Sequence, residues 1–247
     1  WNWKAGGSAS SNTNGTITSS VSVNAAAGFS IVSWTHGSGS QSIGHGLSQK
    51  PDMMIVKKRS GVSSFWTWHK GLSSETQSFI HVNTTNAAGA NANAWNNQAP
   101  TASVFYQKEY ILSNNDTGIA YCFHSVDGYS KVGSFIGNGN VDGAFVHCGF
   151  KPAFLLFRRS TETGSWFMFD NARGTTYNVT GTNFYNVRDN KLNADANYAE
   201  DADSSWNIDF VSNGFKLRSP HVYMNGNNLT HIFIAFAETP FKHTNAH

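Results

Sequence analysis

The sequence contains one long stretch twice. Gly28 begins the first copy, GFSIVSWTHGSGS, and Gly128, 100 residues later, begins the second, GYSKVGSFIGNGNVDG. Further on, Lys50 aligns with Lys151, and this register then holds without a gap to the end of the first copy at His69. A repeat of this length has the size of a domain, which predicts a tandem domain duplication and not a solenoid of short repeats.

Within each copy the apolar residues form runs that are typical of strands. Met53–Val56 matches Phe154–Phe157, and the units close on Ile119–Phe123 and Ile232–Phe236. Continuous apolar runs of this length indicate strands that are buried on both faces. Charged residues make up only 13% of the chain and glycines number 23, which favours short strands and polar turns over helices. The sequence therefore predicts an all-β chain of two tandem, duplicated β-sandwich-like units with long loop excursions.

The repeat also divides the chain. We expect residues 1–16 to be the end of a preceding unit plus a linker, residues 17–126 the first β-sandwich repeat, and residues 127–247 the second. The opening Trp1-Asn2-Trp3-Lys4 has the pattern of a closing strand, and the AGGSASSNTNG that follows it has the composition of a linker. We therefore expect the full polypeptide to extend upstream of Trp1.

Charge, cysteine and histidine content argue against several classes of protein. A formal net charge of +2 is too small to favour a nucleic-acid partner or a membrane surface, and the sequence has no run of eighteen apolar residues for membrane insertion. Cys122 and Cys148 do not occupy equivalent repeat positions, so we expect buried free thiols and not a disulfide. The 10 histidines are scattered and suggest no transition-metal site; His45, between two glycines, is expected at the tip of a flexible loop.

The motifs of the common enzyme classes are missing. The sequence has no Gly-x-Ser-x-Gly elbow, no phosphate-binding loop and no His-Glu-x-x-His. The carboxylates of the second unit gather in one loop, which favours a solvated face or a metal site over an acid/base pair. That loop could hold a calcium ion, although it lacks the spacing of a known calcium loop. The chain is therefore predicted not to be an enzyme and to need no cofactor, with calcium as the one alternative, bound by Asp195, Asp201 and Asp203.

The aromatic residues indicate a binding function. Aromatics reach 14% of the chain, and an exposed ring beside short polar side chains suits a sugar, whose C–H groups stack on the ring while its hydroxyls are hydrogen-bonded. Core packing of the tryptophans and ordinary solvated loops are the alternatives. The candidate ligand-binding residues are Trp95, Asn96 and Asn97 in the first excursion and Tyr177, Asn178, Tyr185, Asn186 and Tyr198 in the second.

As a set, these motifs resemble a known family. The segments GFSIVSWTHGSGS, GHGLSQKPDMMIVKKRS, WNNQAPTASVF, AYCFHSVDGYSKVGSFIGNG and GFKPAFLLFRRS, with the ending AFAETPFKHTNAH, are similar to a repeated domain of bacteriophage virion proteins. That domain is common in marine and cyanobacterial phages and is usually described as tail fibre or as having no known function. The resemblance implies a β-rich protein of the virion surface near the host-contacting end, and it carries no established binding residue.

Together these observations predict a non-catalytic phage tail-fibre or receptor-binding module that contacts a host-surface glycan. Its expected partners are that glycan or receptor, other virion tail proteins, and further copies of itself in a homotrimer. We expect it on the virion surface after assembly in the host cytoplasm. Two alternatives stay open: a carbohydrate-binding module of a secreted polysaccharide-processing enzyme, and a purely structural virion decoration protein.

Overall fold

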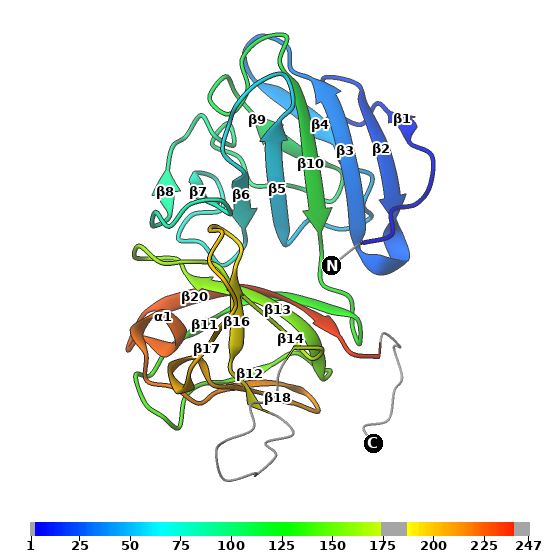
Figure 1. Ribbon diagram of the computed structural model, residues 1–247. Coiled ribbons are helices and arrows are strands. Elements are labelled where there is room, and N and C mark those ends of the chain that lie inside the picture. Colours follow the sequence, from blue (N-terminus) through cyan, green and yellow to red (C-terminus); the bar gives the residue numbers. More distant parts are fainter. Residues whose placement is uncertain (1–2, 174–186, 240–247) are drawn as a thin grey trace. The chain divides into compact units, whose positions relative to one another are not determined.

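The computed structural model describes residues 3–173 and 187–239 (Figure 1). The chain divides into two compact units, which we describe separately. Unit 1 consists of Trp1–Val82 and Ala88–Ser125, and unit 2 of Asn83–Ala87 and Val126–His247. The all-β prediction is confirmed, since 43% of the described residues lie in strands, arranged in antiparallel sheets, and only 4% lie in helices.

Unit 1 has one large sheet and one strand pair. The large sheet has the strand order β1-β2-β3-β10-β5-β6-β7-β8, and the pair is β4-β9. A 3-10 turn, Ala25–Ala27, joins β2 to β3. The strands are β1 (Ser10–Asn12), β2 (Ser19–Asn24), β3 (Phe29–Thr35), β4 (Gln41–Gly44), β5 (Met53–Lys58), β6 (Trp66–His69), β7 (Ser78–His81), β8 (Gly89–Ala90), β9 (Val104–Gln107) and β10 (Thr117–Phe123).

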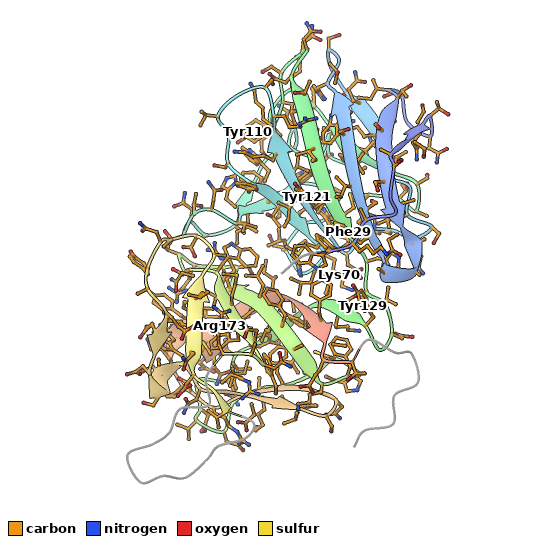
Figure 2. All side chains as sticks on the ribbon, turned by 45° about the vertical axis from the view of Figure 1, so that its right-hand side comes forward. Phe29, Lys70, Tyr110, Tyr121, Tyr129 and Arg173 are labelled. Atoms are coloured by element: carbon orange, nitrogen blue, oxygen red, sulfur yellow. The ribbon has the colours of Figure 1, made fainter. Side chains whose placement is uncertain are left out.

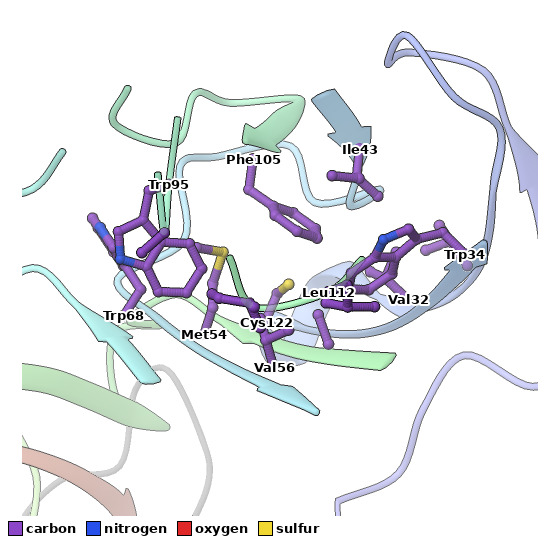
Figure 3. Close-up of a cluster of buried hydrophobic side chains, with 14 of the residues drawn as sticks. Val32, Trp34, Ile43, Met54, Val56, Trp68, Trp95, Phe105, Leu112 and Cys122 are labelled. Carbon is purple, nitrogen blue, oxygen red and sulfur yellow. The ribbon is translucent and has the colours of Figure 1, made fainter. Parts of the chain in front are cut away.

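The core of unit 1 lies between the large sheet and the β4-β9 pair, as in a sandwich. Trp34 and Met54 point inward from the large sheet, and Ile43 and Phe105 face them from the pair (Figure 3). The rings of Trp34 and Phe105 meet edge to face, with 5.4 Å between their centroids. Such pairs are worth roughly 0.5–1.5 kcal/mol beyond the area that they bury, so this contact helps to fix the distance between the two layers.

Unit 2 contains a six-stranded sheet and a smaller four-stranded sheet. One has the strand order β11-β20-β13-β14-β16-β17, and the other has the order β12-β19-β18-β15. The helical elements are the 3-10 turn η2 (Ser204–Trp206) and the single turn α1 (Val222–Asn225). The strands are β11 (Ser130–Ile136), β12 (Phe145–His147), β13 (Pro152–Arg159), β14 (Phe167–Asp170), β15 (Val187–Arg188), β16 (Asn190–Asn193), β17 (Asp201–Ala202), β18 (Ile208–Val211), β19 (Gly214–Leu217) and β20 (Thr230–Ala237).

Phenylalanines dominate the core of unit 2. Phe157 and Phe233 project from the six-stranded sheet, and Phe210 and Phe215 project from the four-stranded one; all four are almost completely buried. Met224 of α1 closes one side of this core. None of the helices that the structure describes is long and apolar enough to span a membrane.

The strand orders of the two units correspond. In unit 1 the sequence β3-β10-β5-β6-β7-β8 runs in the same chain order as β11-β20-β13-β14-β16-β17 in unit 2, and β4-β9 corresponds to β12-β19. In both units the closing strand, β10 or β20, lies between the first long strand and the apolar run, β5 or β13. The predicted strands Met53–Val56 and Phe154–Phe157 lie within β5 and β13, as expected.

The repeated glycines occupy the same conformation in both units. Gly28 and Gly128 have φ of 62° and 71°, and Gly39 and Gly139 have φ of 75° and 66°. Side chains disfavour this left-handed region, which glycine enters without a steric cost. The aligned glycines are therefore explained by the turns that they make.

Two local expectations were wrong. Residues 5–15 do not form a free linker, because β1 pairs with β2 and the Trp3 ring packs on Phe29 and Phe123 at centroid distances of 6.2 and 5.4 Å. His45 is not at an exposed loop tip: its imidazole is fully buried and is hydrogen-bonded to the backbone of Leu47 and Thr101. The expectation for the cysteines is confirmed, since Cys122 and Cys148 are buried free thiols.

The short segment Asn83–Ala87, between β7 and β8 of unit 1, is part of unit 2. Arg158 is fully buried, and its guanidinium group donates hydrogen bonds of 2.8–3.1 Å to the carbonyl oxygens of Thr84, Thr85 and Asn86. The amide of Gly164 also donates to the Thr85 carbonyl, at 2.8 Å. Burial lowers the pKa of Arg158 to about 10, so the group remains charged at neutral pH and the three carbonyl dipoles solvate its charge.

The turn at Gly39 provides a test of the backbone argument. A Cβ atom at Gly39 would meet nothing within 4 Å, so the Gly39→Ala substitution isolates the cost of its positive φ. We expect it to lower the unfolding free energy by about 1 kcal/mol, measured by urea denaturation. The matched control is Gly61→Ala, where φ is not positive and only the end of the Lys58 side chain is near; equal losses in the two variants would contradict the explanation.

The buried His45 predicts a dependence of stability on pH. Its Nδ1 accepts a hydrogen bond from the Leu47 amide, and its Nε2 lies 3.2 Å from the Thr101 carbonyl, which suits a neutral ring. Burial lowers the pKa of His45 to about 4. The unfolded chain therefore binds more protons than the folded one between about pH 6.5 and pH 4, and stability is lost as the pH falls through this window.

Between pH 7 and pH 5 this single group should reduce the unfolding free energy by about 2 kcal/mol. In a His45→Gln variant this part of the pH dependence should disappear, as measured by urea denaturation at both pH values. An unchanged pH dependence in the variant would show that His45 is not the group responsible.

Candidate functional site

A group of aromatic rings in unit 2 extends from the core to the surface. Phe167 of β14 is buried, Trp206 at the end of η2 is half-buried, and Tyr223 of α1 is 37% exposed. His221, the N-cap residue of α1, lies between Trp206 and Tyr223 in this row. We call these four residues, together with Lys191 and Arg159, the unit-2 aromatic cluster.

The rings of this cluster are in contact. The Trp206 centroid lies 5.3 Å from that of Phe167 and 4.7 Å from that of His221, and His221 lies 5.3 Å from Tyr223. Two cations complete the cluster: Lys191 Nζ lies 4.4 Å from the Trp206 centroid, and the Arg159 guanidinium carbon lies 4.4 Å from that of Tyr223. Cations held over ring faces are attracted by the ring quadrupole, which keeps the rings in place.

The acidic partners of these cations hold the cluster together. Asp201 forms an ion pair with Lys191 at 2.9 Å and accepts a hydrogen bond from the Trp206 indole at 2.8 Å. Glu162 pairs with Arg159 at 2.9 Å. Trp206 is therefore fixed from both sides, by Lys191 over its face and by Asp201 at its edge.

His221 can donate a hydrogen bond from this surface. Burial and then the charge of Arg159 lower the pKa of His221, so its ring is neutral at pH 7. Nδ1 accepts from the Tyr223 amide at 3.3 Å, which leaves the proton on Nε2. Among the described residues, neither this Nε2 nor the Tyr223 hydroxyl has a hydrogen-bond partner.

Unit 1 has a cluster at the corresponding place. Trp66 pairs with Val56 just as Phe167 pairs with Phe157, so Trp66 and Phe167 occupy equivalent positions. Around Trp66 lie Phe79 and His81 of β7 and Tyr110 from the segment after β9, with ring centroids 4.6, 4.4 and 5.3 Å from that of Trp66. Tyr110 is labelled in Figure 2. We call these four residues the unit-1 aromatic cluster.

The two clusters differ in charge at one equivalent position. Strand pairing places His81 opposite Trp66 and Asn193 opposite Phe167, so Phe79 corresponds to Lys191. In unit 1 an apolar ring therefore occupies the position that a cation holds in unit 2. Both surfaces offer ring faces at the margin of the core, together with groups that can form hydrogen bonds, an arrangement that suits ligands with an apolar C–H face and hydroxyl groups, such as sugars.

Most candidate residues of the second excursion lie where the structure gives no information. Tyr177, Asn178, Tyr185 and Asn186 are outside the described residues. Tyr198 is described: it lies in the loop between β16 and β17 and is 69% exposed, with no ring contact among the described residues. It is accessible to a ligand but does not belong to the unit-2 aromatic cluster.

The residues of the first excursion have structural roles. Trp95 is only 1% exposed, and its indole donates to the Ser78 carbonyl at 2.8 Å, so it packs in the core and does not present a ring to a ligand. Asn96 and Asn97 have positive φ, and their side-chain oxygens accept from Ser40 and Gln77. Of the two interpretations of Trp95, the structure supports packing.

The proposed calcium ligands do not converge. Asp195 accepts from the Trp166 amide at 2.8 Å, Asp201 binds Lys191 and Trp206, and Asp203 caps η2 by accepting from the Ser205 amide at 2.7 Å. Across residues 3–173 and 187–239, no three His, Cys, Asp or Glu side chains are grouped so as to hold a metal ion. Asp201 and Asp203 instead fix the segment that carries Trp206, and Asp195 ties the loop after β16 to the backbone of Trp166.

These clusters could not be predicted from the sequence, because their members are far apart in the chain. Trp66 and Tyr110 lie on β6 and after β9, and Phe167 and Tyr223 are similarly far apart in the chain. One usable signal was the matched pair Trp66 and Phe167 within the ungapped repeat, because an aromatic residue at the same place in both copies marks a position that both units fill with a ring. The contacting residues come from segments where the repeat is loose.

The comparisons with known proteins identify the family. A family model described as Domain of unknown function (DUF7483) matches residues 1–240. The chain belongs to this family. No curated protein matches the chain, and no solved structure matches it. What a member of this family does must therefore be argued from the site.

The Lys191–Asp201 pair makes the cluster testable. The Lys191 side chain is only 7% exposed, so Asp201→Asn leaves a nearly buried cation without its carboxylate. We expect this variant to lose about 1–3 kcal/mol of unfolding free energy in urea denaturation. The double variant Lys191→Met, Asp201→Asn should regain most of that loss, because it removes the unpaired charge.

Asp142→Asn is the matched control: Asp142 pairs with Lys216 but is 78% exposed, so solvent screens the pair and its loss should hardly change the stability. If Asp201→Asn were as mild as this control, the ion pair would not be what holds Trp206 in place.

Proposed function

We propose that this protein is a non-catalytic module that binds a glycan through the unit-2 aromatic cluster. The observation that carries the proposal is the row of rings from Phe167 to the exposed Tyr223, with His221 Nε2 and the Tyr223 hydroxyl unpaired among the described residues. Ring faces stack on the C–H groups of a sugar, and donors at their edges bind its hydroxyls. The equivalent unit-1 aromatic cluster supports a second contact of the same kind.

The biological setting that we propose is the surface of a bacteriophage virion. The resemblance of the repeat motifs to virion proteins supports a tail-fibre or receptor-binding module that contacts a host-cell glycan or receptor, assembled in the host cytoplasm with other tail proteins. A homotrimer suits this role, since closed symmetry is the rule for homo-oligomers. The corresponding strand orders support an origin of the two sandwich-like units by tandem duplication.

A carbohydrate-binding module of a secreted polysaccharide-processing enzyme is the second candidate. The same aromatic surface favours it, because such modules also bind sugars by ring stacking. The genes beside the coding sequence separate the two: portal, capsid and tail genes support the first, and an attached catalytic domain supports the second. A purely structural decoration protein is distinguished from both by having no glycan ligand.

The test is a glycan array followed by calorimetry on the glycans that bind. Tyr223→Ala and Trp206→Ala should each weaken binding at least about tenfold, because stacking rings are typical hot-spot residues. The matched control is Phe145→Ala, which removes an exposed ring of unit 2 that is 47% accessible and lies outside the cluster. It should leave the affinity unchanged.

Circular dichroism must confirm that each variant is folded. If a glycan binds the Tyr223 and Phe145 variants equally well, the binding site does not include the unit-2 aromatic cluster. Tyr198 is then the next residue to change. Absence of any glycan ligand would favour the structural role.

A further inference from the structure

A second, chemically different surface lies on the large sheet of unit 1. A groove of about 390 Å³ crosses β1, β2, β3 and β10 and reaches the end of β5. Two cross-strand rows form its floor. Ser11, Ser20 and Ser33 lie opposite one another in register, and Thr35 lies opposite Thr117, whose carbonyl accepts from the amide of Arg59.

The side chains of these rows point away from the core. Val32 and Trp34 belong to the buried cluster, so the alternating Ser33 and Thr35 face outward. Ser20 likewise alternates with the buried Ser19 and Val21. The groove is therefore lined by hydroxyl groups, and Arg59 is the one charged residue of its lining.

These polar groups have no partners within the described protein. In residues 3–173 and 187–239, the hydroxyls of Ser11, Ser20, Ser33, Thr35 and Thr117 make no hydrogen bond to another residue. Arg59 is the one described arginine whose side chain forms neither a hydrogen bond nor an ion pair, whereas Arg158, Arg159, Arg173, Arg188 and Arg218 are all engaged. The hydroxyls of the two rows and the Arg59 guanidinium group are thus available to a ligand, whereas the Ser19 hydroxyl, also in the lining, donates to the Gly44 carbonyl.

Nearby negative charge does not neutralise Arg59. Asp116 is adjacent to Thr117 in sequence, but it is paired with Lys58 at 2.8 Å and also accepts from Ser60 and from the Ser113 amide. These bonds, with that of Lys58 first, lower the pKa of Asp116 to about 2. Its charge is therefore already balanced, and Arg59 keeps a net attraction for an anion.

Unit 2 does not repeat this surface. In the equivalent pairings Ile136 lies opposite Thr230 where Thr35 lies opposite Thr117. The aligned counterpart of Arg59 is Ser160, which is buried and bonded to the Thr230 carbonyl. The six-stranded sheet of unit 2 begins at β11, whereas β1 and β2 extend the sheet of unit 1 beyond β3. Hydroxyl rows and a free arginine are thus specific to unit 1.

We propose that this groove binds an acidic saccharide, with Arg59 on its sulfate or carboxylate group and the serine and threonine hydroxyls on its neighbouring hydroxyls. A single cation among hydroxyl groups suits an anion on a hydroxyl-rich ligand, since arginine binds such oxyanions through two parallel bonds. A nucleic acid would require several cations along its backbone. Tyr121 shares the outer face with Thr117, because the two are four residues apart on β10 (Figure 2); its ring extends the surface along the strand.

This groove contains none of the residues of the aromatic clusters, so an experiment can refute either of the two proposed binding sites without refuting the other. The probes are oligosaccharides of dextran sulfate and of polygalacturonate, with neutral dextran oligosaccharides and inorganic sulfate for comparison, titrated calorimetrically into the full chain. A response to dextran sulfate alone identifies a sulfate ligand, and a response to polygalacturonate alone identifies a carboxylate ligand.

We expect Arg59→Gln to weaken binding of the acidic oligosaccharide at least about tenfold, and the double variant Thr35→Val, Thr117→Val to weaken it several-fold without a change of charge. The control is Lys108→Gln, which removes one exposed positive charge from unit 1 outside the groove and should have little effect.

Three results would overturn the proposal. They are the absence of binding by either acidic probe, an equal loss in the Arg59 and Lys108 variants, and neutral dextran binding as tightly as the acidic probes. An equal loss would indicate general charge attraction. Tight binding of single-stranded oligonucleotides in a parallel titration, lost in the same Arg59 variant, would reassign the groove to a phosphate-bearing partner.

Discussion

The fold of each unit depends on the insertion of its closing strand between two strands that come earlier in the chain. β10 pairs on one side with β3 and on the other with β5, and β20 pairs in the same way with β11 and β13. These closing strands also contribute fully buried residues to the core, such as Ala120 and Ala235. Without them, the two neighbouring strands would present open edges to solvent, which is where sheets aggregate.

That central arrangement fixes the framework and leaves the margins free to differ. The aromatic clusters are built mainly on the fourth and fifth strands of the shared order, β6 and β7 in unit 1 and β14 and β16 in unit 2, and on segments after β9 and β19. At one equivalent position of this framework, unit 1 has the apolar ring of Phe79 and unit 2 has the ion-paired cation of Lys191. On the opposite margin of unit 1, β1 and β2 add the hydroxyl-lined face that unit 2 lacks.

The sequence was informative where burial is continuous and uninformative where contacts join distant segments. The apolar runs of β5 and β13 could be placed because both faces of such strands are covered, and the glycines of the turns could be aligned because positive φ selects them. Trp95 and Trp206 begin similar segments of the sequence, WNNQAPTASVF and WNIDFVSNGF, yet Trp95 is buried and Trp206 is half-buried. The prediction for His45 was wrong because flanking glycines suggest a flexible loop. Its buried ring is instead hydrogen-bonded to the carbonyl of Thr101, 56 residues away, and to the amide of Leu47 in its own loop.

The path of the chain through residues 83–87 limits how the protein can be divided. Arg158 takes its carbonyl partners from this segment, which lies in the sequence between β7 and β8 of unit 1. A fragment that began at residue 126 would contain Arg158 but not those three carbonyl groups, and it would have to hydrate a buried cation by another route. Evolution by exchange of single units is constrained in the same way, because a recombination point between residues 125 and 126 would also separate this arginine from its ligands. Unit 2 is therefore not encoded by one continuous stretch of the gene, because residues 83–87 belong to it as well.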